Sequence, residues 1–165
     1  MITLTTVMFK VKLLMLGPCE SGKTVLANFL ADATDTSSGE YHPTQGVRFE
    51  GCWPAIAKDT IGIVFVYNPD QPNHDKDLDS WFDYFVEQQA VKKAHCIVFA
   101  HHKPGVGENE RTQLSTFFKD IPCIQTNIEE DGDSVRNQFS DYLSGIMSAL
   151  TDNKEQEELS IMNHR

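Results

Sequence analysis

An eight-residue motif near the start of the chain constrains its fold more than any other feature. Residues 17–24 match the phosphate-binding pattern G-x-x-x-x-G-K-[ST], and an apolar segment typical of a buried strand, Phe9 to Leu16, precedes them. Apolar residues recur at helical spacing directly after the motif. This strand-loop-helix order favours phosphate binding over the alternative, a glycine turn beside a surface lysine.

Each part of the motif has a role in binding phosphate. The glycines let backbone N–H groups close around the phosphates, Lys23 neutralises their oxygens, and Thr24 presents its hydroxyl to Mg²⁺. The sequence therefore predicts a phosphate site. The predicted site residues are Gly17, Pro18, Cys19, Glu20, Ser21, Gly22, Lys23 and Thr24.

Composition narrows the class of partner. The 165 residues fit one domain, and the formal net charge of −10 disfavours a nucleic-acid or anionic membrane surface, because binding those needs clustered Lys and Arg. The four cysteines form no C-x-x-C pair, which suits a reduced, cytoplasmic compartment. The longest apolar run is strand-sized, and we find no lipidation motif. We expect no nucleic-acid partner and no direct membrane anchor.

The rest of the chain alternates between strand and helix patterns. Thr60 to Tyr67 is a β-branched run without polar alternation, which indicates a central parallel strand. The alternation predicts an α/β fold with a mostly parallel sheet. We divide the chain into a domain over residues 1–150 and a polar tail over 151–165. The other predicted elements are strands at His95 to Ala100 and Pro122 to Thr126, and helices at Asp75 to Val91, Glu110 to Lys119 and Ser134 to Leu150.

Five motifs occur together within residues 9–150. They are residues 17–24, Asn28-Phe29-Leu30, Pro43-Thr44-Gln45-Gly46-Val47-Arg48, Cys52-Trp53-Pro54-Ala55 and Ala100-His101-His102-Lys103-Pro104-Gly105. The first motif and Thr44-Gln45-Gly46 resemble the Ras-like small GTPases. The whole set more narrowly resembles the Rab-like small GTPase subunit of the intraflagellar transport B complex. The histidine pair before Lys103 is the most specific part, because ordinary GTPases carry other residues there.

The resemblance implies a Ras-like P-loop fold and a nucleotide-binding adaptor that acts in cilium assembly and transport. It implies GTP or GDP with Mg²⁺ as cofactors, and other subunits of that complex, which we expect to be coiled-coil proteins, as partners. The implied location is the cytoplasm, the cilium and the ciliary base. The lack of a lipidation motif agrees with an adaptor, since vesicle-bound Rab relatives need one.

The resemblance also assigns residues outside the loop. Thr44 would complete the Mg²⁺ shell with Thr24, although turn chemistry alone would also favour a Pro-Thr pair there. The base-reading segment N-K-x-D of typical members is replaced by His102, Lys103, Pro104 and Gly105, so Lys103 can lie along the base but no carboxylate reads it. We therefore expect loose base specificity. A metal site at the histidine pair is disfavoured, because adjacent residues of an extended chain point opposite ways.

The chain departs from the family between Thr44 and Trp53. Only Gln45 to Cys52 separate them, and so short a segment spans at most about 30 Å, too little for two paired strands and the D-x-x-G switch. We interpret this as the loss of one contiguous block. The surviving string Asp59-Thr60-Ile61-Gly62 precedes its strand, so we expect it at the sheet edge opposite the phosphates.

The missing block has two consequences. Little or no hydrolysis is expected, because the segment that orients the attacking water is missing and the side chain of Cys19 crowds the site of an arginine finger. One edge of the first strand is also expected to be exposed unless Ile2 to Met8, Val47 to Glu50 or a partner covers it. Two other functions stay open: a competent GTPase switch and a P-loop small-molecule kinase, the latter disfavoured because the four arginines are dispersed.

Overall fold

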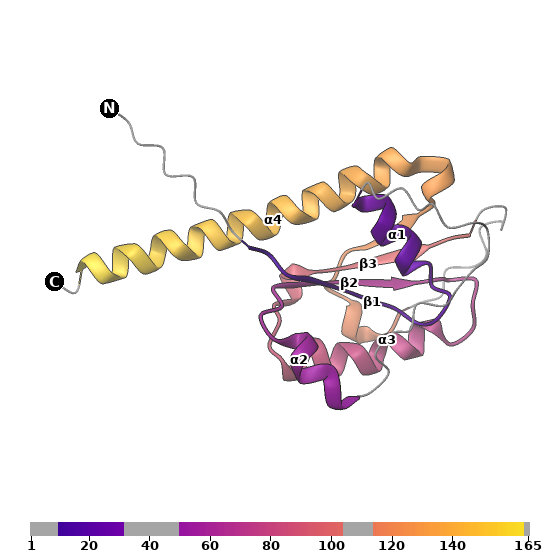
Figure 1. The fold of residues 1–165 in the computed structure, drawn as a ribbon, viewed down its shortest axis with the longest axis horizontal. Coiled ribbons are helices and arrows are strands. Elements are labelled where there is room, and N and C mark those ends of the chain that lie inside the picture. The colour runs from indigo at the N-terminus through magenta and orange to yellow at the C-terminus, as the bar shows by residue number, and fades with distance from the viewer. Residues whose placement is uncertain (1–9, 32–49, 104–113, 164–165) are drawn as a thin grey trace.

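A computed structural model of the chain describes residues 10–31, 50–103 and 114–163 (Figure 1). Its centre is a four-stranded parallel sheet whose spatial order, β1-β2-β3-β4, follows the order along the chain. The predicted α/β class with a mostly parallel sheet is confirmed. The strands are β1 (Leu13–Leu16), β2 (Gly62–Tyr67), β3 (Cys96–His101) and β4 (Cys123–Thr126).

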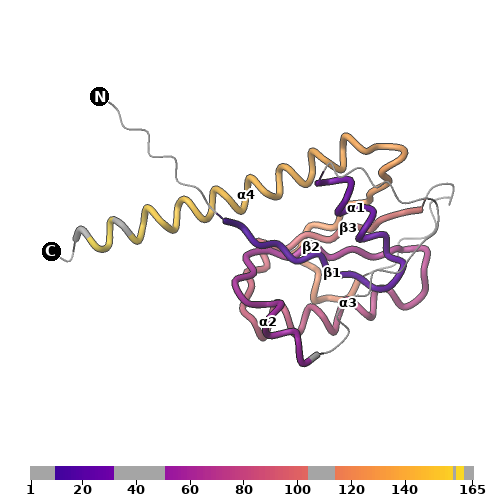
Figure 2. Tube along the Cα trace, in the orientation of Figure 1, coloured from indigo at the N-terminus to yellow at the C-terminus, as the bar shows by residue number. Residues whose placement is uncertain are grey.

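Helices cover both faces of the sheet (Figure 2). Helices α1 (Lys23–Leu30) and α4 (Ile128–Asn163) pack on one face, and α2 (Trp53–Ala57) and α3 (His74–Phe82) on the other. Alternate residues of β2 belong to the two cores: Val64 and Val66 lie on the α1 side. Ile63, Phe65 and Tyr67 lie on the α3 side. Strand β2 is therefore buried on both faces, which explains why its sequence is an unbroken apolar run.

Two helices differ from their predicted extents. The helix expected over Asp75 to Val91 is α3 followed by a π-helical stretch, Asp83–Gln88. Helix α4 is interrupted by the non-helical backbone of Asp131 (φ −145°, ψ 55°), so its long part begins close to the expected Ser134, but it continues past residue 150 to Asn163 (Figure 1). Leu159 and Ile161 in this extension are exposed. The charged tail thus extends a helix within the described residues, and the division at residue 150 stays a prediction.

Sequence periodicity did not predict the secondary structure of two short segments. Within residues 114–119 of the predicted helix Glu110 to Lys119, the structure has only a single 3₁₀ turn, Thr116–Phe118, so that part of the prediction is wrong. The five-residue helix α2 was not predicted. Its first residue, Trp53, packs against Tyr84 and Phe85, with ring centroids 4.8 and 5.5 Å apart. Tertiary contacts therefore stabilise α2 more than helix propensity does.

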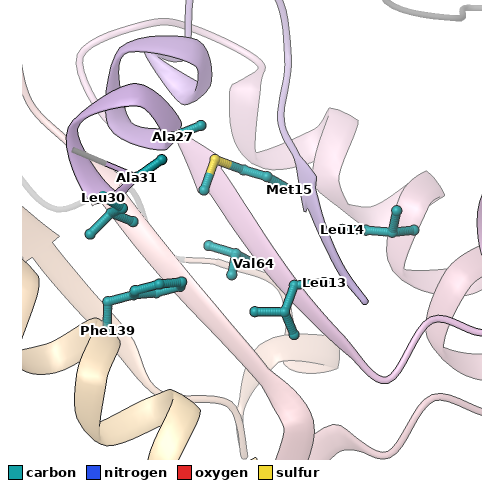
Figure 3. A pocket seen from close by; sticks show the side chains of 8 residues that line it. All are labelled: Leu13, Leu14, Met15, Ala27, Leu30, Ala31, Val64 and Phe139. Atoms are coloured by element: carbon teal, nitrogen blue, oxygen red, sulfur yellow. The ribbon is translucent and has the colours of Figure 1, made fainter. Parts of the chain in front are cut away.

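Strand β1 forms one edge of the described sheet. Within the described residues it pairs only with β2, and all four of its residues are half-buried, whereas β2 and β3 are buried throughout. The segments that we expected to cover this edge, Ile2 to Met8 and most of Val47 to Glu50, lie outside the described residues. An apolar groove of about 280 Å³ lies beside β1, between α1, β2 and α4 (Figure 3).

Candidate functional site

The predicted phosphate loop lies at the carboxyl edge of the parallel sheet. It directly follows β1 and packs across the end of β2, because a Cβ on Gly17 would overlap the carbonyl oxygen of Val66. Farther along, the loop lies over the end of β3, where a Cβ on Gly22 would come within 2.5 Å of the His101 ring. Ligands of open α/β sheets bind at this edge.

Hydrogen bonds within the loop define its shape. The amide N–H of Ser21 donates to the carbonyl of Pro18 (3.3 Å), and that of Leu26 donates to Gly22 (2.9 Å), which starts α1. Lys23 Nζ donates to the carbonyl of Pro18 (3.1 Å), which places its ammonium over the loop. Gly22 has a left-handed backbone (φ 85°), a conformation that glycine adopts without the strain of a Cβ.

The loop residues fit a bound phosphate group. A side chain at Gly17 or Gly22 would overlap Val66 or His101, so glycine at both positions lets the loop lie close to the strand ends, and Lys23 supplies a cation. The Ser21 side chain is buried, and its hydroxyl oxygen has no hydrogen-bond partner within the described residues. Thr24, the predicted Mg²⁺ ligand, is exposed in the first turn of α1, directly after the loop glycine Gly22 and Lys23. Thr44 lies outside the described residues.

The structure brings part of the predicted base-reading segment to the same edge. His102 directly follows β3, with its Nδ1 3.4 Å from Asp70 Oδ2 and its Nε2 2.5 Å from Gln125 Oε1. Lys103 is exposed beside it. Pro104 and Gly105 lie outside the described residues. A ligand held by its phosphates in the loop could therefore extend towards His102 and Lys103.

Four further polar residues lie at this edge, and the sequence did not predict a role at this site for any of them. His101 and Thr126 lie at the ends of β3 and β4, while Asn68 and Asp70 follow β2. One Asp70 oxygen faces His102 and the other is buried without a partner among the described residues. Their position directly after buried strands was the available signal, because carboxyl ends of parallel strands meet at one edge.

Asp59 lies at the opposite edge of the sheet, as expected. The neighbouring amide of Ile61 donates to the carbonyl of Lys12 (2.9 Å), just before β1. Lys12 Nζ in turn donates to the carbonyls of Ile56 and Lys58 (2.7 and 2.8 Å). The Asp59-Thr60-Ile61-Gly62 string therefore lies away from the phosphate loop.

Two features are absent from the described part of the chain. It holds no group of three or more His, Cys, Asp or Glu side chains positioned to share a metal ion. None of its helices has both the length and the apolar character needed to cross a membrane.

Two buried histidines near the loop make folding sensitive to acid. Burial lowers the pKa of His74, near Glu20 and Lys23, and burial together with His102 lowers the pKa of His101. The unfolded chain, with the ordinary value of 6.5, therefore binds protons that the folded chain rejects, so stability falls as the pH drops below that value.

We expect the melting temperature to decrease from pH 7.5 to about pH 5.5, and to decrease less steeply in a His101→Phe variant. Thermal melts across this range provide the measurement. Parallel pH profiles for the two proteins would contradict the prediction.

Comparisons with known proteins agree with this geometry. No family model matches the chain. It is 39% identical over 186 residues to "Intraflagellar transport protein 22 homolog" of Danio rerio, covering 94% of this chain and 100% of the relative. The Xenopus tropicalis protein of the same name is 40% identical over 183 residues, with the same coverage.

Solved structures share the fold. The "T. brucei IFT22 GDP-bound crystal structure" has a TM-score of 0.64 and 26% identity, covering 84% of this chain and 96% of that one. The GTP-bound T. brucei IFT22 structure has a TM-score of 0.53 and 28% identity, covering 78% and 94%. The sheet and loop thus define a P-loop protein of the small GTPase type. Within that class, the chain belongs to the intraflagellar transport protein 22 family.

The comparison also bears on the predicted missing block. The Danio rerio alignment spans 186 residues, whereas 94% of this chain is about 155 residues. About 31 residues of that relative therefore have no counterpart here. Two short strands and a switch segment would account for a difference of this size.

Proposed function

We propose that this chain is a nucleotide-binding, small GTPase-like subunit of the intraflagellar transport B complex. It acts as an adaptor in cilium assembly and transport, in the cytoplasm, at the cilium and at the ciliary base. The observation that carries this proposal is the phosphate loop, with Lys23 over it and His102 and Lys103 at the same sheet edge. The GDP- and GTP-bound structures of the T. brucei relative support a guanine nucleotide as the ligand.

We assign the phosphates to residues 17–24 and the base to the side of Lys103 and Gly105. Thr24, together with Thr44, would hold Mg²⁺, which neutralises phosphate charge when bound. Direct titration of the purified chain with Mg²⁺-GTP, Mg²⁺-GDP and Mg²⁺-ATP tests this assignment. Saturable binding of at least one nucleotide is expected, and no binding at millimolar concentration would overturn the proposal.

We expect negligible turnover and a weak preference for guanine. The segment that normally orients water is missing, so hydrolysis should stay below about one turnover per minute. Without a carboxylate at position 105, discrimination against adenine loses charge-assisted hydrogen bonds worth about 1.5–3 kcal/mol each. Phosphate release and competition between GTP and ATP are the measurements. Rapid turnover would instead favour the active GTPase switch, and a strong preference for GTP would contradict loose base reading.

We expect a partner protein to stabilise the chain by covering the β1 edge. Within the described residues this edge is unpaired and lies beside an apolar groove lined by Leu13, Leu30 and Phe139 (Figure 3). Unpaired backbone groups and exposed apolar surface are liabilities that association removes. The partners that we propose are coiled-coil subunits of the intraflagellar transport B complex.

Co-expression with counterparts of the proteins named with IFT22 in the "T. brucei IFT22/74/81" structure tests this expectation. Soluble yield should rise, and the melting temperature should increase by about 5 °C or more. The nucleotide-saturated chain alone is the control, because ligand binding also raises stability. A monomer that melts cooperatively and is unaffected by those proteins would remove the support for an adaptor.

A further inference from the structure

The imidazole of His101 lies directly under the phosphate loop. Successive residues of β3 point to opposite faces of the sheet, and Ile97 and Phe99 belong to the core on the α1 side. His101 is the next residue in that row. Its ring meets the backbone at Gly22, where a Cβ would come 2.5 Å from Cδ2 and 3.2 Å from Nε2.

A neighbouring strand holds this ring in place. Thr126 of β4 stands opposite His101 in the parallel register, and its Oγ1 lies 3.1 Å from His101 Nδ1. Both side chains are buried, with 7% and 2% of their surfaces exposed. The amide of His102 also donates to the carbonyl of Thr126 (2.9 Å). The ring is therefore confined by packing above and a hydrogen bond beside it.

The His101 ring contacts a glycine, the residue type with the most conformational freedom. Glycine loses more backbone entropy on ordering than any other residue, and Gly22 must hold φ 85° at the point where α1 begins. The amides that follow it are the groups that a phosphate at a helix N-terminus would meet. A rigid ring against Gly22 restricts the backbone without adding a side chain to the loop itself.

We propose that His101 is a positioning residue of the phosphate loop: its ring, oriented by Thr126, holds Gly22 and the start of α1 in the conformation that binds phosphate. The inference rests on the proposed function for its ligand, but the positioning is a property of the chain without nucleotide. Burial lowers the pKa of His101, so the ring packs against the loop uncharged.

Amide hydrogen exchange of the nucleotide-free, full-length chain tests the positioning directly. The reporters are the amides of Ser21 and Leu26, which bond to Pro18 and Gly22 within the loop. We expect His101→Gly to speed their exchange about tenfold, because the ring is replaced by a cavity, while β2 amides keep their protection. His101→Phe should restore most of the protection, since it keeps a planar ring under Gly22.

His95→Gln is the matched control. His95 is equally buried (7%) but precedes β3, at the opposite edge of the sheet, where its Nδ1 lies 3.1 Å from the carbonyl oxygen of Ile61. It should leave loop exchange unchanged. Wild-type loop exchange in His101→Gly would overturn the proposal.

If His101→Gly also speeds the exchange of β2 amides, a Thr126→Val variant provides the decisive test. This substitution removes the hydrogen bond to His101 and leaves little cavity. Faster exchange confined to the loop supports the proposal, and unchanged loop exchange overturns it.

Nucleotide titration separates this inference from the proposed function. His101→Gly should weaken binding of Mg²⁺-GTP about tenfold, with recovery in His101→Phe. A wild-type chain that binds no nucleotide would overturn the proposed function, yet the exchange experiment would still decide the role of His101. A wild-type chain that binds, with equal affinity in His101→Gly, would overturn this inference alone.

Discussion

Replacing Lys23 with alanine is expected to weaken Mg²⁺-nucleotide binding by about 3 kcal/mol, or roughly 100-fold. Lys23 Nζ already lies over the loop through its bond to the Pro18 carbonyl, where its charge can reach phosphate oxygens. The loop otherwise offers backbone donors, and Glu20 adds a negative charge beside them. Calorimetric or fluorescence titration of the two proteins measures the loss.

Lys12→Ala is the matched control for this experiment. Lys12 also donates to backbone carbonyls, those of Ile56 and Lys58, but at the opposite edge of the sheet. Its removal should cost about 1 kcal/mol of stability and leave nucleotide affinity unchanged. Equal nucleotide affinities for wild type and Lys23→Ala would show that the loop does not bind the phosphates of a nucleotide.

Gly17→Ala is expected to lower stability by about 1–3 kcal/mol, equivalent to a fall of about 3–10 °C in melting temperature, and to weaken nucleotide binding as well. The added Cβ would overlap the carbonyl oxygen of Val66 and come 2.7 Å from Ser21 Oγ. Val66 belongs to β2, an inner strand that pairs with both β1 and β3, so its backbone cannot shift without disturbing the sheet. The loop must therefore move away from the strand.

Gly145→Ala separates this steric effect from the general effect of replacing glycine. A Cβ on Gly145, in α4, would meet nothing within 4 Å, so the substitution should raise stability by up to about 1 kcal/mol. Thermal melts of both variants, followed by nucleotide titration, provide the comparison. A Gly17→Ala protein as stable as wild type would mean that the loop does not pack on Val66 as described.

The phosphate loop and the strands could be predicted from the sequence, because each depends on residue types at neighbouring positions. Glycine spacing with Lys23 and Thr24 specifies a phosphate loop in any chain that places it between a strand and a helix. Strand β2 was recognisable because burial on both faces demands a continuous apolar run. The same reasoning placed Asp59 away from the phosphates, since it precedes its strand.

Residues that act through distant neighbours could not be recognised in this way. His101 was recognised only as part of the histidine pair of the family motif and as a disfavoured metal ligand, because its contacts with Gly22 and Thr126 join three segments that are remote in sequence. Helix α2 was missed for a similar reason: five residues are too few for a periodic pattern, and Trp53 is held by rings 31 and 32 residues away, Tyr84 and Phe85.

The sequence by itself determined the α/β class, the phosphate loop and the family, since each depends on residue types at short and regular spacings. Only the tertiary structure decided what surrounds the loop. The parallel register sets Val66, His101 and Thr126 at one edge of the sheet, and that register follows from the packing of both faces as a whole. The sequence indicates that the carboxyl ends of the strands share one edge, but not which side chains touch there, so the support beneath Gly22 became visible only in three dimensions.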